Sequence, residues 1–246
     1  MNTNTFNLLN TQLLKINFSL SPEQLAQFAT YTSELLSYNA HTNLISREIK
    51  TEEDLLNRHI LDSLSLLEFW DKLPLAKPKS LADIGSGGGF PGLCLAIARP
   101  ELEVVLIDSV GKKTEFLKSV VKTLKLENRV QVELGRIEEI AHERDFRETF
   151  DIVTSRAVSA MPTVSELGLP LLEKDGCLVS YKSKNGLTEE IESAQALIGQ
   201  LGGGKASIHV PTLGNEEKNH CLVFIAKIKQ TPTTFPRVWS KIKGKK

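Results

Sequence analysis

The chain has 246 residues, with 30 basic and 30 acidic side chains and 41% hydrophobic residues. This composition is that of a globular protein of one large or two small domains, and it excludes a disordered, collagen-like or coiled-coil chain. A net charge of zero lacks the basic excess that marks many nucleic-acid-binding proteins. The zero is uneven along the chain, because residues 230–246 carry five basic side chains and no acidic ones.

Two helices are expected in the first part of the chain. Residues 21–24 read Ser-Pro-Glu-Gln, which combines an N-cap, a first-turn proline and a capping-box glutamine, and predicts a helix to about Asn39. Thr51 predicts the start of a second helix, because three acidic residues follow it in the first turn. The apolar face of that helix comprises Leu56, Ile60, Leu64 and Leu67.

From Ser80 onward, short apolar runs alternate with helical patterns. This alternation predicts an α/β fold, a Rossmann-like doubly wound sheet with helices on both faces. The last two runs are separated only by a turn, so they predict an antiparallel hairpin. The predicted strands are residues 81–84, 104–107, 130–134, 150–154, 177–181, 207–210 and 222–226, and the predicted helices are residues 91–99, 112–125, 137–145, 161–172 and 187–201.

A glycine-rich segment, residues 83–92, follows the first strand and opens the next helix. Glycines there let a ligand approach the backbone at the helix N-terminus. The dinucleotide pattern GxGxxG is excluded because Phe90 stands in place of its last glycine, and a P-loop lysine is absent. The pattern that fits is D-x-G-x-G-x-G, which resembles motif I of class I S-adenosylmethionine-dependent methyltransferases. Its members are Asp83, Gly85, Gly87 and Gly89.

Three further residues follow the second and third strands. Asp108 ends the second strand, where a carboxylate accepts hydrogen bonds from both ribose hydroxyls of a nucleoside cofactor. Ile137 and Glu138 lie in the loop that usually holds the adenine in methyltransferases of this class. A role of Glu138 in the first turn of a helix, where acidic residues are favoured, is equally compatible with the sequence.

Arg156 ends the fourth strand, at the sheet edge where cofactor and methyl acceptor should meet. An Asn/Asp-Pro-Pro-Tyr motif for base amines and a Pro-Cys motif for cytosine C5 are both absent, and no side chain is set up as a general base. Guanine N7 carries a lone pair and no proton, so its methylation needs alignment rather than deprotonation. The sequence therefore favours guanine N7 as acceptor.

Taken together, these segments resemble the RsmG family, also called glucose-inhibited division protein B. Its members are bacterial guanine-N7 methyltransferases of 16S ribosomal RNA. The resemblance spans most of the chain. The matching segments are residues 43–46, 58–64, 83–92, 108–113, 116–117, 155–158 and 235–237.

The resemblance implies that S-adenosylmethionine is held by the glycine loop, Phe90, Ile137, Glu138 and Arg156, and it makes Arg156 the candidate catalytic residue. Two departures stand out. The family usually has alanine at position 137. Its tail usually reads Tyr-Pro-Arg with a glycine soon after, whereas residues 235–239 here read Phe-Pro-Arg-Val-Trp.

The candidate RNA-contacting residues are basic. Two lysines begin the helix after Asp108, where the helix dipole disfavours cations, one follows the fifth strand, and an arginine lies in the tail. These residues are Lys112, Lys113, Lys182 and Arg237. Lys182 is also a candidate for the acceptor pocket, and we expect the tail, residues 231–246, to act as an RNA-contacting arm.

His59 is a tempting general base. It shares a helix face with Leu56 and Ile60, so a packed, hydrogen-bonded histidine is favoured, with Asp62 available to orient it. Whether His59 or Lys182 takes part in catalysis stays open at this level.

Three segments are expected: a helical extension over residues 1–78, the methyltransferase domain over 79–229 and a basic tail over 230–246. The three cysteines form no metal or disulfide pattern, and neither a signal peptide nor a membrane-length apolar run is present. We therefore expect a cytoplasmic monomer without a metal, acting on 16S ribosomal RNA or the small subunit. A small-molecule methyltransferase and a non-catalytic ribosome-assembly factor are the alternatives.

Overall fold

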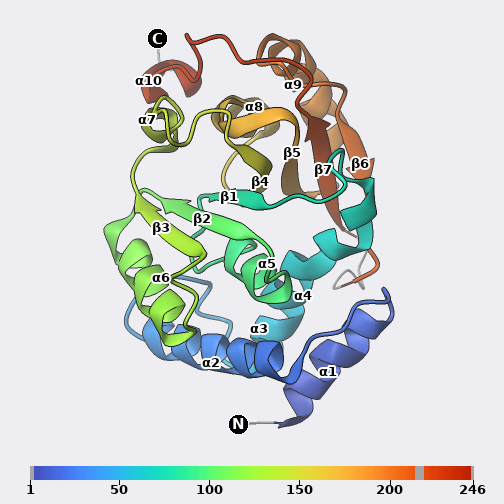
Figure 1. Cartoon of the computed structure of the whole chain (residues 1–246), viewed down its shortest axis with the longest axis vertical. Helices are drawn as coiled ribbons and strands as arrows, with labels where there is room; N and C mark the ends of the chain where they lie inside the picture. The colour runs from blue at the N-terminus through green and yellow to red at the C-terminus, as the bar shows by residue number, and fades with distance from the viewer. Residues whose placement is uncertain (1–2, 214–218, 245–246) are drawn as a thin grey trace.

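The computed structural model describes residues 3–213 and 219–244, and its centre is a seven-stranded sheet (Figure 1). The strand order is β3-β2-β1-β4-β5-β7-β6, with β1 to β5 parallel, β7 antiparallel to β5, and β6 antiparallel to β7. The predicted doubly wound sheet with a terminal hairpin is confirmed. The strands are β1 Ser80–Ile84, β2 Glu103–Asp108, β3 Val130–Leu134, β4 Phe150–Arg156, β5 Leu172–Ser183, β6 Ser207–His209 and β7 His220–Ala226.

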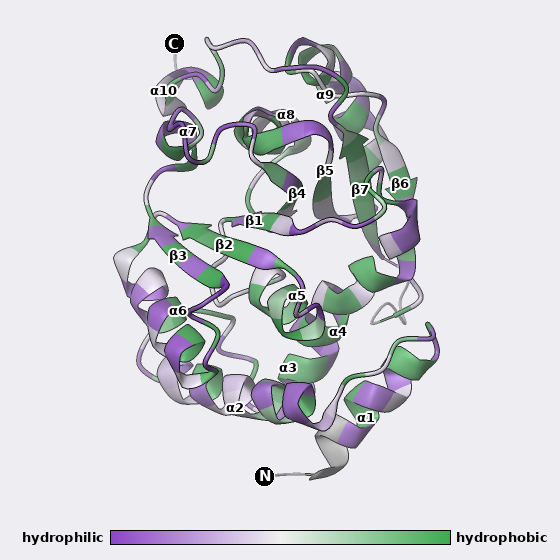
Figure 2. Ribbon diagram, viewed as in Figure 1, coloured by the Kyte–Doolittle hydropathy of each residue, from purple (hydrophilic) through white to green (hydrophobic). Residues whose placement is uncertain are grey.

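Helices cover both faces of this sheet. Successive strand residues point to opposite faces, so each strand contributes apolar side chains to both layers of packing. Leu106 packs in one apolar core with the N-terminal helices, α5 and α6, whereas its neighbour Ile107 packs in the other with α7, α8 and α9 (Figures 1 and 2). The helices that follow the strands are α5 Gly92–Ala98, α6 Gly111–Thr123, α7 Ile137–Ile140, α8 Met161–Gly168, the 3₁₀ turn η3 Leu169–Leu171, α9 Leu187–Gln200 and α10 Trp239–Ile242.

The N-terminal region is more helical than expected. Helix α1, Thr3–Leu14, was not predicted, although Leu9 and Leu13 are spaced one turn apart and are fully buried. Helix α2, Pro22–Asn39, begins as predicted: Ser21 Oγ accepts from the Gln24 amide at 3.2 Å, and Gln24 Oε1 accepts from the Ser21 amide at 2.8 Å.

The predicted second helix was wrong in one respect, because it is not a uniform α-helix. Thr51 caps it as expected, but after α3, Glu52–Leu55, the chain forms a five-residue π-helix, η1 Leu56–Ile60. It continues as α4, Leu61–Leu64, and ends in a 3₁₀ segment, η2 Ser65–Lys72. Short π-helical segments occur frequently at functional sites, and this one carries His59.

The two terminal segments lie at opposite ends of the molecule (Figure 1). Lys245 and Lys246 of the predicted tail, and residues 214–218 between β6 and β7, lie outside the described residues. Among the helices that are described, none is both long and apolar enough to cross a membrane.

Candidate active site at the carboxyl ends of the strands

The glycine-rich loop joins β1 to α5 and turns sharply over the end of β2. The amides of Gly85 and Ser86 both donate to the Ile107 carbonyl, at 2.8 and 3.0 Å. Gly85, Gly87 and Gly89 have φ values of 73°, 58° and 106°, which L-residues with a side chain rarely adopt. The loop therefore requires glycine at the three motif positions, and its path exposes backbone to a ligand.

Asp83 braces this loop from inside the sheet. Its carboxylate is fully buried and accepts hydrogen bonds from the Gly92 amide at 3.1 Å and from Thr154 Oγ1 at 2.8 Å. Burial raises the pKa of Asp83 to about 6, against the lowering effect of these hydrogen bonds. Asp83 therefore connects β1, β4 and the start of α5. It supports the loop from within the protein and does not line the cavity beside it.

Asp108 at the end of β2 holds the loop from the other side. One carboxylate oxygen accepts from the Gly87 amide at 2.9 Å and the other from the Val110 amide at 2.9 Å. Lys113 Nζ lies 3.6 Å from the first of these oxygens. Lys113, one of the candidate RNA contacts, is thus directed toward the candidate ribose-binding acid.

A cavity of about 250 Å³ opens beside this loop. Its wall includes four of the predicted cofactor-binding residues: Gly85, Asp108, Ile137 and Glu138. The other predicted cofactor-binding residues near this loop, Asp83, Gly87, Gly89 and Phe90, do not line the cavity. The elements that meet here are the ends of β1 and β2, the start of α7 and the C-terminal tail, so the structure brings together segments that are far apart in the sequence.

The tail reaches the cavity through Trp239, which sequence reasoning did not single out. Trp239 lines the wall, and the guanidinium of Arg136 lies 4.5 Å from the centre of its ring. Arg136 Nε also donates to the buried Glu138 carboxylate at 2.9 Å. The signal in the sequence was the departure from the family's tail pattern, which puts a tryptophan at position 239.

Arg156 is clamped at the end of β4. Its Nε lies 3.0 Å from the Asp62 carboxylate, and Nη2 donates to the Arg58 carbonyl at 3.0 Å and to His59 Nδ1 at 2.9 Å. The guanidinium also lies 5.6 Å from the centre of the Phe90 ring. Asp62 thus orients Arg156 and not His59, contrary to the expectation from sequence.

His59 packs between this arginine and the glycine loop. Its ring stacks on Phe90, with centroids 4.9 Å apart and planes at 22°. Burial, and then the positive charge of Arg156, lower the pKa of His59 to about 4. A neutral imidazole whose Nδ1 already accepts a hydrogen bond is a packing and orienting group, as the sequence favoured.

A second cavity, of about 290 Å³, lies next to the first and shares Ala157 and Val158 with it. Its polar lining includes Asp62, Arg156, Ser180, Lys182 and His220. The shared wall is strained, because Ala157 has a φ of 56°, a conformation that is uncommon outside glycine and clusters at functional sites.

The other candidate RNA contacts are placed differently from one another. Lys182 Nζ donates to the Ser159 carbonyl at 2.7 Å and pairs with Glu190 at 2.6 Å, at the edge of the second cavity. Lys112 is exposed at the start of α6. The Arg237 guanidinium pairs through two nitrogens with Glu166, a carboxylate with 1% exposure, at 2.8 and 2.6 Å.

The strand order, the acid–glycine loop and the acid that ends β2 define a class I S-adenosylmethionine-dependent methyltransferase. Solved structures with this fold include an O-methyltransferase from Bacillus cereus in complex with SAH, at 18% identity and a TM-score of 0.52 over 81% of this chain and 90% of that chain. A predicted O-methyltransferase from Agrobacterium tumefaciens, at 16% identity, gives a TM-score of 0.52 over 70% and 82%.

Sequence relatives identify the family within this class. The profile of the GidB family, described as rRNA small subunit methyltransferase G, matches residues 24–221. A relative with that name from Desulfitobacterium hafniense is 40% identical over 91% of this chain and 89% of its own. One from Chloroflexus aggregans is 40% identical over 96% of both chains. The chain belongs to the rRNA small subunit methyltransferase G family.

Proposed function

We propose that the protein transfers the methyl group of S-adenosylmethionine to N7 of a guanine in the 16S ribosomal RNA. The observation that carries the proposal is the meeting of two cavities at Ala157 and Val158, at the carboxyl ends of the strands. One cavity is walled by the acid–glycine loop and the other by a polar set on β4, β5 and α4. Ligands of doubly wound sheets bind at this edge.

The residues of the first cavity fit the cofactor. A carboxylate offers about four acceptor sites, so Asp108 retains capacity for the ribose hydroxyls after accepting from Gly87 and Val110. Ile137 and Glu138 wall the end assigned to the adenine. Arg156 lines the adjoining second cavity, 5.6 Å from the centre of the Phe90 ring, where its guanidinium suits the cofactor's carboxylate. When bound, the cofactor supplies a sulfonium-activated methyl group.

The protein's part in the reaction is to position the two partners. The pKa of His59, about 4, leaves this imidazole neutral, and its Nδ1 is engaged by Arg156. Guanine N7 needs no proton removed before it attacks, so an in-line arrangement held by Arg156 and its partners is sufficient. The neutral, engaged His59 and an acceptor that needs no proton removed together support N7 over an amine or a hydroxyl.

The proposal also covers the organisation of the protein. We propose a helical extension over residues 1–78, a catalytic domain over 79–229 and a tail over 230–246, working as a monomer in the cytoplasm. The three thiols, Cys94, Cys177 and Cys221, are buried and unpaired, which suits a reducing compartment.

The test is methyl transfer to small subunits purified from cells that lack the protein. With methyl-labelled S-adenosylmethionine, we expect label in the 16S RNA from the wild type and none from Arg156→Ala, whose fold is checked by circular dichroism. RNA that stays unlabelled with the wild-type protein contradicts the proposal and leaves a small-molecule acceptor or a non-catalytic role in assembly.

A further inference from the structure

The second cavity is lined by Ser180, a residue whose buried hydroxyl group has no partner within the described part of the fold. Ser180, on β5, has 1% exposure, and its Oγ has no hydrogen-bond partner among the described residues. A buried polar atom without a partner costs free energy, so such an atom in a cavity wall indicates a ligand that supplies the partner. Ser180 pairs with Ser155 of the neighbouring strand β4, and Ser155 also lines the cavity.

Around Ser180, the cavity offers both acceptors and donors. The Asp62 carboxylate is 5% exposed and accepts from Arg156 through one oxygen, while His220 Nδ1 lies 3.2 Å from the other. The Lys182 ammonium has three protons, of which two are directed to Ser159 and Glu190. A carboxylate with remaining acceptor capacity therefore stands near an ammonium with a remaining donor.

We propose that this cavity is the pocket for the acceptor guanine, with Asp62 and Ser180 as its specificity-determining residues. The inference rests on the proposed function and identifies the residues that recognise the acceptor base. Asp62 accepts from the N1–H and N2–H₂ groups of guanine, and Lys182 together with the Ser180 hydroxyl donates to O6. Guanine N7 then lies on the side of Ala157 and Val158, the wall shared with the cofactor cavity.

The same set of groups rejects adenine. Adenine presents an unprotonated N1 to the carboxylate and an amino group to the ammonium, so both contacts become repulsive. Enzymes that modify a base inside a folded nucleic acid turn it out of the stack into a pocket that reads its pairing edge. The size of the cavity, about 290 Å³, is that of a pocket for one base and not for a stretch of RNA.

Ser180→Ala provides the first test, because it removes one oxygen and nothing else. If Ser180 only fills space, losing an unsatisfied hydroxyl leaves the KM for the ribosomal substrate unchanged and does not lower the melting temperature. We expect instead a KM about 5- to 10-fold higher, with the affinity for S-adenosylhomocysteine, measured by calorimetry, unchanged. An unchanged KM overturns the assignment.

The second test changes the base. Small subunits are reconstituted with 16S RNA in which the methylated guanosine is replaced by inosine, which keeps N7 and O6 but lacks the 2-amino group. Losing a hydrogen bond to a carboxylate predicts a kcat/KM about 10- to 100-fold lower for the wild type. Asp62→Asn is expected to use guanosine and inosine within about threefold of each other, because its amide cannot replace the charged acceptor.

His59→Gln is the matched control, since His59 also holds Arg156 but does not line the cavity. It should keep the wild-type preference for guanosine. Equal use of both bases by the wild type, or a preference that survives Asp62→Asn, overturns the pocket while leaving methyl transfer to guanine intact. The absence of any label in guanine would instead refute the proposed function.

Discussion

Gly92 shows at the scale of one residue why the loop at the cofactor cavity tolerates little change. The Gly92 amide donates to the buried Asp83 carboxylate, which requires the backbone to pass directly against that side chain. A Cβ added at Gly92 would lie 2.5 Å from Asp83 Cβ and 2.6 Å from Leu106 Cδ2. The residue is glycine because of this close approach and not because of an unusual φ.

We predict that Gly92→Ala loses cofactor affinity and unfolding free energy together, because β1 and α5 must move apart to admit the methyl group. Overpacking of this kind costs about 1 to 3 kcal/mol. Gly111→Ala is the control, since nothing lies within 4 Å of the added Cβ at that helix start. Thermal melting and calorimetry with S-adenosylhomocysteine check both variants, and equal behaviour of the two would contradict the account.

His59 makes a prediction about pH. Its pKa of about 4 in the folded protein lies below its ordinary value of 6.5, so unfolding takes up a proton between these values. The stability it contributes is complete above pH 6.5 and is lost as the pH falls toward 4, by up to about 3 kcal/mol. Asp83, whose pKa is raised to about 6, changes stability in the opposite sense.

The measurement is urea unfolding of the wild type and His59→Gln at pH 7 and pH 4.5. Because Asp83 is common to both proteins, the difference isolates His59, and the variant should lose less stability on acidification than the wild type. Parallel losses in the two proteins would show that His59 is not held neutral.

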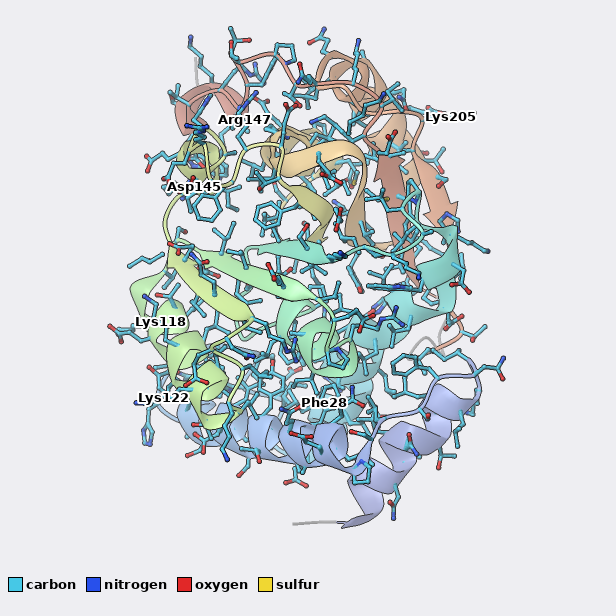
Figure 3. All side chains as sticks on the ribbon, in the orientation of Figure 1. Phe28, Lys118, Lys122, Asp145, Arg147 and Lys205 are labelled. Atoms are coloured by element: carbon cyan, nitrogen blue, oxygen red, sulfur yellow. The ribbon has the colours of Figure 1, made fainter. Side chains whose placement is uncertain are left out.

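At the scale of elements, the C-terminal tail is held by the segment before β4 and by α8 before it reaches the cavity. The guanidinium of Arg147 donates to the carbonyls of Thr231 and Phe235, both at 2.9 Å, and Figure 3 shows Arg147 beside this segment. The Arg237–Glu166 pair then holds the next turn, and α10 places Trp239 at the cavity wall. The tail, which the sequence predicts to be an RNA-contacting arm, is over residues 231–239 packed against the rest of the protein.

This arrangement predicts a fluorescence signal. The chain has two tryptophans, and Trp70 is buried under Arg99 away from the cavity, whereas Trp239 lines it. Titration with S-adenosylhomocysteine should change the emission of the wild type and of Trp70→Phe, and leave that of Trp239→Phe unchanged. Binding detected by calorimetry with no change in wild-type emission would place the cofactor away from the tail.

The elements that the sequence predicts well have local causes. The strands follow from their apolar runs, the start of α2 from its capping box, and the glycine loop from its spacing between β1 and α5. Helix α1 was not predicted because asparagine and threonine residues surround its buried leucines and obscure the apolar pattern. Local patterns also do not encode the Asp62–Arg156 pair or the seating of Trp239, since each depends on how distant segments pack.

At the scale of the whole molecule, the zero net charge conceals basic groups of two kinds. Arg237 and Lys113 are paired with acids at the site, whereas Lys241 and Lys243 in the tail are exposed. Exposed cations near the cofactor cavity suit contact with RNA phosphates.

We predict that replacing both Lys241 and Lys243 by glutamine makes RNA binding less dependent on salt. The slope of log Kobs against log salt should fall in magnitude by between about 1 and 2. Lys205→Gln, on the exposed surface near β6 in Figure 3, is the control and should retain the wild-type slope. Unchanged slopes in both variants would mean that this part of the tail does not contact RNA.

The central claim is that the two cavities hold S-adenosylmethionine and a guanine side by side, so that the methyl group passes to N7 of that guanine. Its most direct test is to identify the methylated nucleoside after a reaction of purified protein and cofactor with small subunits. These subunits come from cells that lack the protein. Digestion of the 16S RNA and mass spectrometry should find 7-methylguanosine that is missing from a reaction with Arg156→Ala. A methyl group on another atom of guanine, on another base or on ribose would contradict the account.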